Sequence, residues 1–194
     1  PLIEEVEPLE TILNQYKTDF EKGSLNMMRS KLGLHTKDKK DQSLIQELED
    51  ILHLTETDMT ILFRNLSDFK KSERSNGLTI IQNAFYEPDE VIGNVKNRWV
   101  AWFKNYADRL KKETFTDEER KAKMNRVNPK YVLRNYMAQL AIDDADKGDY
   151  RLIDELFQML KKPYDEQSEY QKWFVKRPDW ARDKVGCSML SCSS

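Results

Sequence analysis

Apolar residues along this chain recur three or four positions apart, the spacing of one helix face, and rarely show the alternation typical of β-strands. The clearest run starts at Pro8 and ends at Gly33, because glycine readily takes the left-handed conformation that closes a helix. Similar runs follow along the chain. They predict an all-α array of about seven helices with an irregular C-terminal tail, anchored by spaced aromatic side chains.

Short polar motifs predict where several helices begin and end. Thr116 and Glu119 have the spacing of a capping box, in which each side chain accepts a hydrogen bond from the backbone amide of the other residue. Asn128 before Pro129 predicts a helix start, because Asn is a good N-cap and Pro fits the first helical position. Gly148 predicts the end of that helix. Further N-caps are expected at Asp41, at Thr57 or Asp58, and at Asp149.

The long amphipathic run from Pro88 to Leu110 predicts another helix, with Trp99 and Phe103 in its apolar stripe. Bulky aromatic residues in such a stripe are typical of core packing. Trp102 lies just beside the stripe, so it is a candidate contact for a partner.

The chain shows only one weak internal boundary. Residues 68–78 are polar and interrupted by glycine, which is typical of a loop between folded segments. We therefore expect one helical domain over residues 1–181 and a flexible tail over residues 182–194. The length of 194 residues fits one domain of ordinary size, but the start at Pro1 rather than Met suggests a piece of a longer protein.

Charges are nearly balanced, with 32 Lys and Arg against 34 Asp and Glu, and a net charge of -2 at pH 7. Nucleic acids and anionic membranes attract surplus basic residues, so neither is an expected partner. One basic stretch near tyrosines is a candidate nucleic-acid contact, but interleaved acids favour a solvated or ion-paired helix face. Its members are Arg120, Lys121, Lys123, Arg126, Lys130 and Arg134. Without a signal peptide or a run of roughly 20 apolar residues, the sequence indicates a soluble intracellular protein.

The sequence offers no convincing catalytic, cofactor-binding or metal-binding residues. The acidic cluster from Asp143 to Asp149 resembles a calcium loop, but Gly148 stands where an oxygen ligand belongs. A helix end followed by an N-cap explains this segment better. His35 and His53 are far apart, and histidines near helix ends interact favourably with the helix dipole. Glycine-rich phosphate loops are absent.

Two cysteines, Cys187 and Cys192, lie near the end of the sequence. Their spacing fits neither the CxxC motif of thiol oxidoreductases nor a zinc site. An accessible thiol near the carboxyl end can exchange with a partner thiol, although an idle terminal cysteine explains the position equally well.

Several motifs together resemble the C-terminal region of the selenoprotein O family. The longest is NPKYVLRNYMAQLAI at residues 128–142, and the others are MRSKLGL (28–34), ILFRNLSD (61–68), PYDEQSEY (163–170), PDWA (178–181) and SCSS (191–194). The resemblance extends over nearly the whole chain.

The resemblance implies a protein-kinase-like, pseudokinase fold that uses ATP and Mg or Mn to transfer AMP to Ser, Thr or Tyr of acceptor proteins. The family's nucleotide and metal ligands lie in a catalytic core that this sequence lacks, so this chain is expected to be its helical C-terminal part, inactive alone. Its implied partner is that core. Cys192 matches the family's selenocysteine or cysteine position and implies a redox tail. Cys187, which matches no known family position, is a second redox candidate that can pair with Cys192.

The family also implies a cytoplasmic location in bacteria or a mitochondrial one in eukaryotes. Two alternatives stay open beside the adenylyltransferase hypothesis. One is a self-standing helical module that binds another protein, and the other is a thiol redox protein that acts through Cys192.

Overall fold

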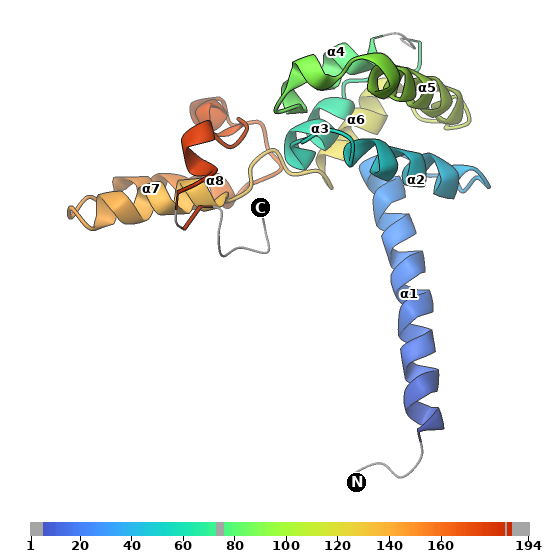
Figure 1. Ribbon diagram of the computed structural model, residues 1–194, viewed down its shortest axis with the longest axis horizontal. Coiled ribbons are helices and arrows are strands. Elements are labelled where there is room, and N and C mark those ends of the chain that lie inside the picture. The colour runs from blue at the N-terminus through green and yellow to red at the C-terminus, as the bar shows by residue number, and fades with distance from the viewer. Residues whose placement is uncertain (1–5, 73–75, 185, 188–194) are drawn as a thin grey trace.

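The computed structural model describes residues 6–72, 76–184 and 186–187, and helices joined by irregular segments make up these ranges (Figure 1). No strand forms in the described ranges; the only β-type pairing there is a single antiparallel bridge between Thr57 and Phe85. The all-α prediction is therefore confirmed. The α-helices are α1 (Glu7–Lys31), α2 (Asp41–Leu52), α3 (Met59–Leu66), α4 (Gly77–Ile81), α5 (Gly93–Leu110), α6 (Asp117–Asn125), α7 (Asn135–Ala145) and α8 (Arg151–Leu160). Four short 3-10 helices accompany them: η1 (Gln82–Ala84), η2 (Pro88–Glu90), η3 (Ser168–Trp173) and η4 (Asp179–Ala181).

The larger of two hydrophobic clusters gathers around α5 and contains side chains from Met28 to Met124. Trp99 and Phe103 stack with ring centroids 5.8 Å apart, and both are almost fully buried. Trp102 is buried beside them, and its indole N–H donates to the backbone oxygen of Leu44 at 2.9 Å. The expectation that Trp102 faces a partner is wrong, because this hydrogen bond lets the whole indole enter the core.

The smaller cluster joins α7, α8 and the segment that follows them. Tyr131, Met137 and Met159 are buried there, and Trp173 lies half-buried at the edge. Phe174 packs against both clusters, so it connects them. The described residues 164–184 of the irregular tail lie on the helices through Tyr170, Trp173 and Phe174, as the sequence predicts.

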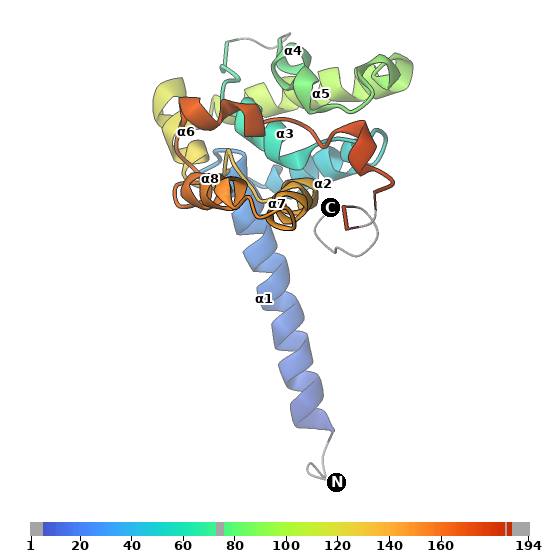
Figure 2. The same cartoon turned by 90° about the vertical axis from the view of Figure 1, so that its left-hand side faces the viewer.

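Helix α1 extends away from the rest of the molecule, as two perpendicular views show (Figures 1 and 2). Only its C-terminal end joins the larger cluster, through buried Met28 and half-buried Leu25. Glu7 and Glu10 in the first turn, with Arg29 and Lys31 in the last, suit the helix dipole. Gly33 follows the helix at φ 68°, the left-handed conformation that the sequence predicts for it.

Several predicted helix ends are confirmed. The capping box forms, with the Thr116 hydroxyl accepting from the Glu119 amide at 3.1 Å and the Glu119 carboxylate accepting from the Thr116 amide at 2.9 Å. Asp58 caps α3 by accepting from the amide of Ile61 at 3.0 Å. Gly148 follows α7 at φ 82°.

The predicted helix start at Asn128 is wrong, since α7 begins only at Asn135. The Asn128 amide side chain instead donates to the backbone oxygen of Lys31 at 2.9 Å. The backbone amides of Lys130 and Tyr131 both donate to the oxygen of Pro163. These tertiary bonds hold the segment extended, which outweighs its local capping signal.

Other boundaries also differ from the prediction. The stretch before α5 forms the separate 3-10 helix η2, so α5 starts at Gly93 rather than at Pro88. Asp41 is the first residue of α2 rather than its N-cap, and Tyr150 rather than Asp149 is the cap of α8. The candidate boundary at residues 68–78 lies within the span of the larger cluster, where Phe69 is fully buried.

Candidate functional site

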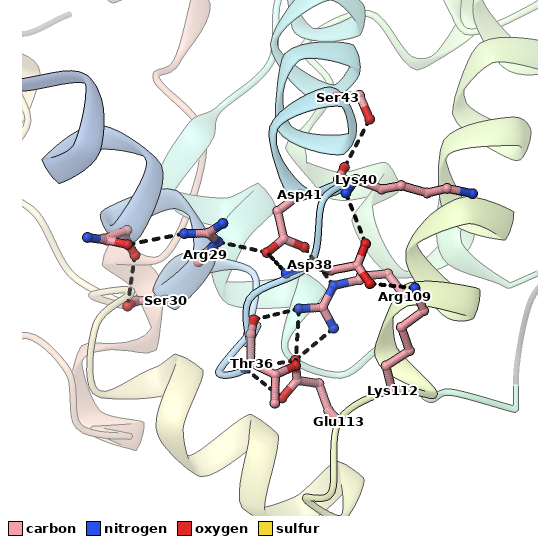
Figure 3. Close-up of polar contacts among 11 residues, drawn as sticks. Arg29, Ser30, Thr36, Asp38, Lys40, Asp41, Ser43, Arg109, Lys112 and Glu113 are labelled. Carbon is pink, nitrogen blue, oxygen red and sulfur yellow. Dashed lines mark hydrogen bonds and ion pairs between the residues drawn. The ribbon is translucent and has the colours of Figure 1, made fainter. Parts of the chain in front are cut away.

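A cluster of charged side chains lies where α1, α2 and α5 meet (Figure 3). Asp41 at the start of α2 is fully buried and receives the guanidinium groups of Arg29 from α1 and Arg109 from α5. The Nε atoms of the two arginines lie 2.7 and 2.6 Å from the Asp41 carboxylate oxygens. One carboxylate therefore ties three helices together.

The same guanidinium of Arg109 continues the network toward Glu113, which follows α5. Arg109 Nη1 donates to Glu113 Oε1 at 2.8 Å, and Nη2 donates to the backbone oxygen of Thr36 at 2.6 Å. The Thr36 hydroxyl donates to Glu113 Oε1 at 2.6 Å. With side chains only 4% and 1% exposed, Arg109 and Glu113 exchange bonds with each other rather than with solvent.

Hydrogen bonding keeps these buried carboxylates ionised. Burial raises the pKa of Asp41, but bonds from Arg109, the Asp38 amide and Arg29 outweigh it and hold that pKa below its ordinary value. Burial also opposes ionisation of Glu113, and bonds from Thr36 and Arg109 again leave its pKa lowered. At the rim, the Lys112 ammonium and the Lys40 amide lower the pKa of Asp38 to about 2.

This network has the properties of a structural joint. Its buried carboxylates accept hydrogen bonds from several donors, so they are poorly suited to abstract a proton or to bind a metal ion. A cavity of about 450 Å³ opens beside it between α2 and α5, with Lys40, Ser43, Asn105 and Lys112 among its lining residues. Acidic and basic side chains share this lining, so the cavity has no dominant charge that would select one class of ligand.

A second set of ion pairs joins the two hydrophobic clusters through α3. Asp58 accepts hydrogen bonds from both terminal nitrogens of Arg134, which directly precedes α7. Arg64 of α3 donates to the backbone oxygen of Asn128 at 3.0 Å and to the carboxylate of Glu166 at 2.7 Å. Helix α3 and its N-cap Asp58 therefore connect the two hydrophobic clusters through polar contacts.

The basic stretch of the sequence is largely used within the molecule. Arg120 is buried and donates to the backbone oxygens of Phe69 and Ser67. Lys130 is nearly buried and binds Glu166, and Lys121 pairs with Asp68. This arrangement matches the ion-paired interpretation of the stretch.

The two redox candidates fall in different parts of the chain. Cys192 lies outside the described residues. Cys187 is a free cysteine, only 2% exposed, within the smaller cluster. Its backbone oxygen accepts a hydrogen bond from the Asn135 side chain at 3.5 Å. A redox role stays a prediction for both residues.

The described ranges contain no group of three or more His, Cys, Asp or Glu side chains placed to hold a metal ion. His35 and His53 are exposed, and the His35 ring meets Phe115 edge-on with ring centroids 4.9 Å apart. The acidic cluster is divided among separate ion pairs. Asp143 pairs with Lys184, and Asp149 pairs with Arg151.

Sequence reasoning missed the network of Arg29, Asp41, Arg109 and Glu113. A signal for it exists, because Arg109 and Glu113 continue the spacing of the buried stripe through Trp99, Trp102 and Tyr106. Oppositely charged residues four apart on a buried stripe indicate an internal ion pair. The pattern of α5 contains this signal, whereas the partner Asp41 lies 68 residues away.

Comparison with known proteins decides the family. The sequence model described as "Protein adenylyltransferase SelO" matches residues 1–161. The chain belongs to the SelO family. The match includes all of the helices from α1 to α8, so the long projecting helix is part of the family sequence.

Relatives within the SelO family match this chain over its full length. The protein nucleotidyltransferase YdiU of Flavobacterium johnsoniae is 58% identical over 195 residues, which is 100% of this chain and 37% of the relative. The proteins of the same name from Rhodopirellula baltica and Aromatoleum aromaticum are 43% and 39% identical, with 38% and 36% of their lengths covered. The chain thus spans a little over a third of the length of the curated relatives it matches.

None of the helices in the described ranges combines the length and the apolar character needed to cross a membrane.

Proposed function

We propose that this chain is the helical C-terminal part of a protein adenylyltransferase, which transfers AMP from ATP to Ser, Thr or Tyr of acceptor proteins. In this proposal the chain supports a kinase-like core that holds the reacting groups, with ATP and Mg or Mn bound there. The observation that carries the proposal is the SelO family match over residues 1–161, together with relatives that are named protein nucleotidyltransferases and are far longer.

The arrangement of charges supports a structural role for the chain. Phosphoryl and nucleotidyl transfer need cationic groups on the phosphates and carboxylates on the metal ions. Here the buried carboxylates of Asp41 and Glu113 are instead held by Arg29, Arg109 and Thr36. These hydrogen bonds would have to break before the carboxylates could bind a metal ion or the arginines could bind the phosphates of ATP.

The proposal is tested by incubating the chain with labelled ATP, Mg or Mn and candidate acceptor proteins, beside the full-length F. johnsoniae relative. We expect label transfer with the relative and none with this chain alone. A thermal shift of the chain with ATP and metal gives a second readout, in which we expect no stabilisation. Robust transfer by the chain alone would place the reacting groups within it and contradict the proposal.

A redox function of the tail belongs to the same proposal. The Cys192 thiolate would attack oxidised glutathione, breaking its disulfide to form a mixed disulfide and release one glutathione thiolate. A core thiolate would then attack the Cys192 sulfur and release the second glutathione, and the resulting protein disulfide would switch activity. Titration of the two cysteines against glutathione buffers, in wild type and Cys192→Ser, measures this directly. An ordinary thiol with no pairing to a core cysteine removes the redox function and leaves the adenylyltransferase proposal in place.

A stand-alone module for protein binding is the second candidate function, because α1 carries a long exposed apolar face. The gene distinguishes the binding module from the adenylyltransferase part. An open reading frame that starts at this chain favours the binding module. By family resemblance, we propose the cytoplasm as the site of action in a bacterium and the mitochondrion in a eukaryote.

A further inference from the structure

The N-terminal two thirds of α1 present an unusual apolar surface. Its residues alternate three and four positions apart, the spacing that brings side chains onto one seam of a helix. Each seam side chain is between 47% and 67% exposed. The seam consists of Val6, which is the N-cap of the helix, and of Leu9, Leu13, Tyr16 and Phe20, and Ile12 widens it at 66% exposure.

This surface is unpartnered within the described chain. Of the 25 residues of α1 only Met28 is buried, and no other described helix lies beside the projecting part of α1 (Figures 1 and 2). Tyr16 and Phe20 stack only on each other, with ring centroids 6.3 Å apart. Contiguous apolar faces of this size mark interaction sites, because leaving them in water is unfavourable.

The width of the face indicates what kind of partner fits. A two-stranded coiled coil buries only the alternating seam, so pairing of two copies through it would leave Ile12 at the flank. A band that also includes Ile12 is the face of a helix packed on a globular body. The polar side of the helix carries Thr11 and Thr18, whose hydroxyls donate to the backbone oxygens four residues earlier.

We propose that this face of α1 docks on the remainder of the longer SelO-family protein, which is the part of the relatives that lies outside their match to this chain. The inference rests on the proposed function. It is supported by the family match, which includes the helix, and by the relatives, whose unmatched sequence is almost two thirds of their length. Helix α1 would then link the unmatched part to the larger cluster, because Arg29 and Asp41 fix the other end of this helix to α2 and α5.

The test replaces the matched region of the full-length F. johnsoniae relative by this chain, which is 58% identical to it. The test variant is Leu13→Glu with Phe20→Glu on the apolar face. The matched control is Thr11→Glu with Thr18→Glu, which adds the same charges at the same separation on the polar face. We expect the test variant to lower the unfolding temperature of the chimera by several degrees and its AMP transfer at least tenfold, with little change in the control.

Measurements on the chain alone keep the result interpretable. There both double variants should unfold within about a degree of the wild type, because all four positions are exposed. Equal unfolding temperatures of the two chimera variants would overturn the docking inference. So would a dimer of the chain alone, seen in sedimentation, that the test variant dissociates.

The assay also separates docking from the proposed function. If the test variant lowers the unfolding temperature of the chimera but the chimera without substitutions transfers no AMP, the result supports docking and contradicts the adenylyltransferase proposal. If the test and control variants of the chimera transfer AMP equally well and unfold at the same temperature, the result contradicts docking but leaves the adenylyltransferase proposal in place.

Discussion

Helices α1 and α5 carry similar patterns of large apolar residues, yet their surroundings are opposite. In α5, Trp99 and Phe103 are 0% and 1% exposed, and the rings of Phe69 and Phe85, from two other segments, pack on them. In α1, Tyr16 and Phe20 are 67% and 63% exposed. The comparison shows that hydrophobic periodicity predicts a helix and its apolar face, but does not say whether the chain itself supplies what covers that face.

Truncation of aromatic side chains is the strongest way to test this contrast. Phe103→Ala should lower the free energy of unfolding of the chain by about 3–5 kcal/mol, because it removes buried contacts and leaves a cavity. Phe20→Ala should change it by no more than about 0.5 kcal/mol. Urea unfolding of both variants measures the difference. Equal losses would mean that α1 is covered in the isolated chain.

The charged joint between the two helices gives the next largest effect. Arg109→Met should cost roughly 3 kcal/mol at neutral pH, because it leaves Asp41 and Glu113 buried without their shared cation. Lys111→Met, at an exposed residue of the same region, is the matched control, and we expect a change within about 0.5 kcal/mol.

The pH dependence of the joint follows from the lowered pKa values of Asp41 and Glu113. Groups with a lowered folded pKa stabilise the fold above their ordinary values of 3.8 and 4.5, and this stability is lost as pH falls through the folded values. The difference between wild type and Arg109→Met should therefore be largest near pH 7 and shrink toward pH 3. A difference independent of pH would contradict the ionised joint.

Two glycines give the smallest and most local comparison. A Cβ at Gly77 would lie 2.2 Å from the Phe103 ring, so Gly77→Ala should destabilise the chain by about 1–3 kcal/mol. A Cβ at Gly23 in α1 meets nothing within 4 Å, so Gly23→Ala should stabilise it by about 0.5–1 kcal/mol. Thermal unfolding distinguishes the signs, and a destabilising Gly23→Ala would indicate close packing around α1.

Local signals predicted much of the fold because they act within a few residues. The capping box at Thr116 and the left-handed Gly148 are satisfied by neighbours in sequence, and both form. The signal at Asn128 failed because distant groups, Lys31 and Pro163, compete for the same polar atoms. Trp102 was misjudged for a related reason, since its position beside the stripe gives no information about the carbonyl of Leu44.

The candidate site was less predictable than the helices. The joint at Asp41 combines residues from three segments, so no contiguous motif encodes it. Family resemblance identified the SelO family because the motifs at residues 28–34, 61–68 and 128–142 are long. The same resemblance assigns Cys192 a role that only chemistry on the whole protein can test.

Hydrogen exchange of α1 in the chain alone and in the chimera tests the central claim most directly. In the chain alone, the amides of residues 7–22 should exchange far faster than those of α5, because no packing opposes local opening of the exposed helix. In the chimera they should become protected, approaching the amides of α5. Equal exchange of residues 7–22 in the two proteins would contradict the claim that the rest of a SelO-family protein covers α1.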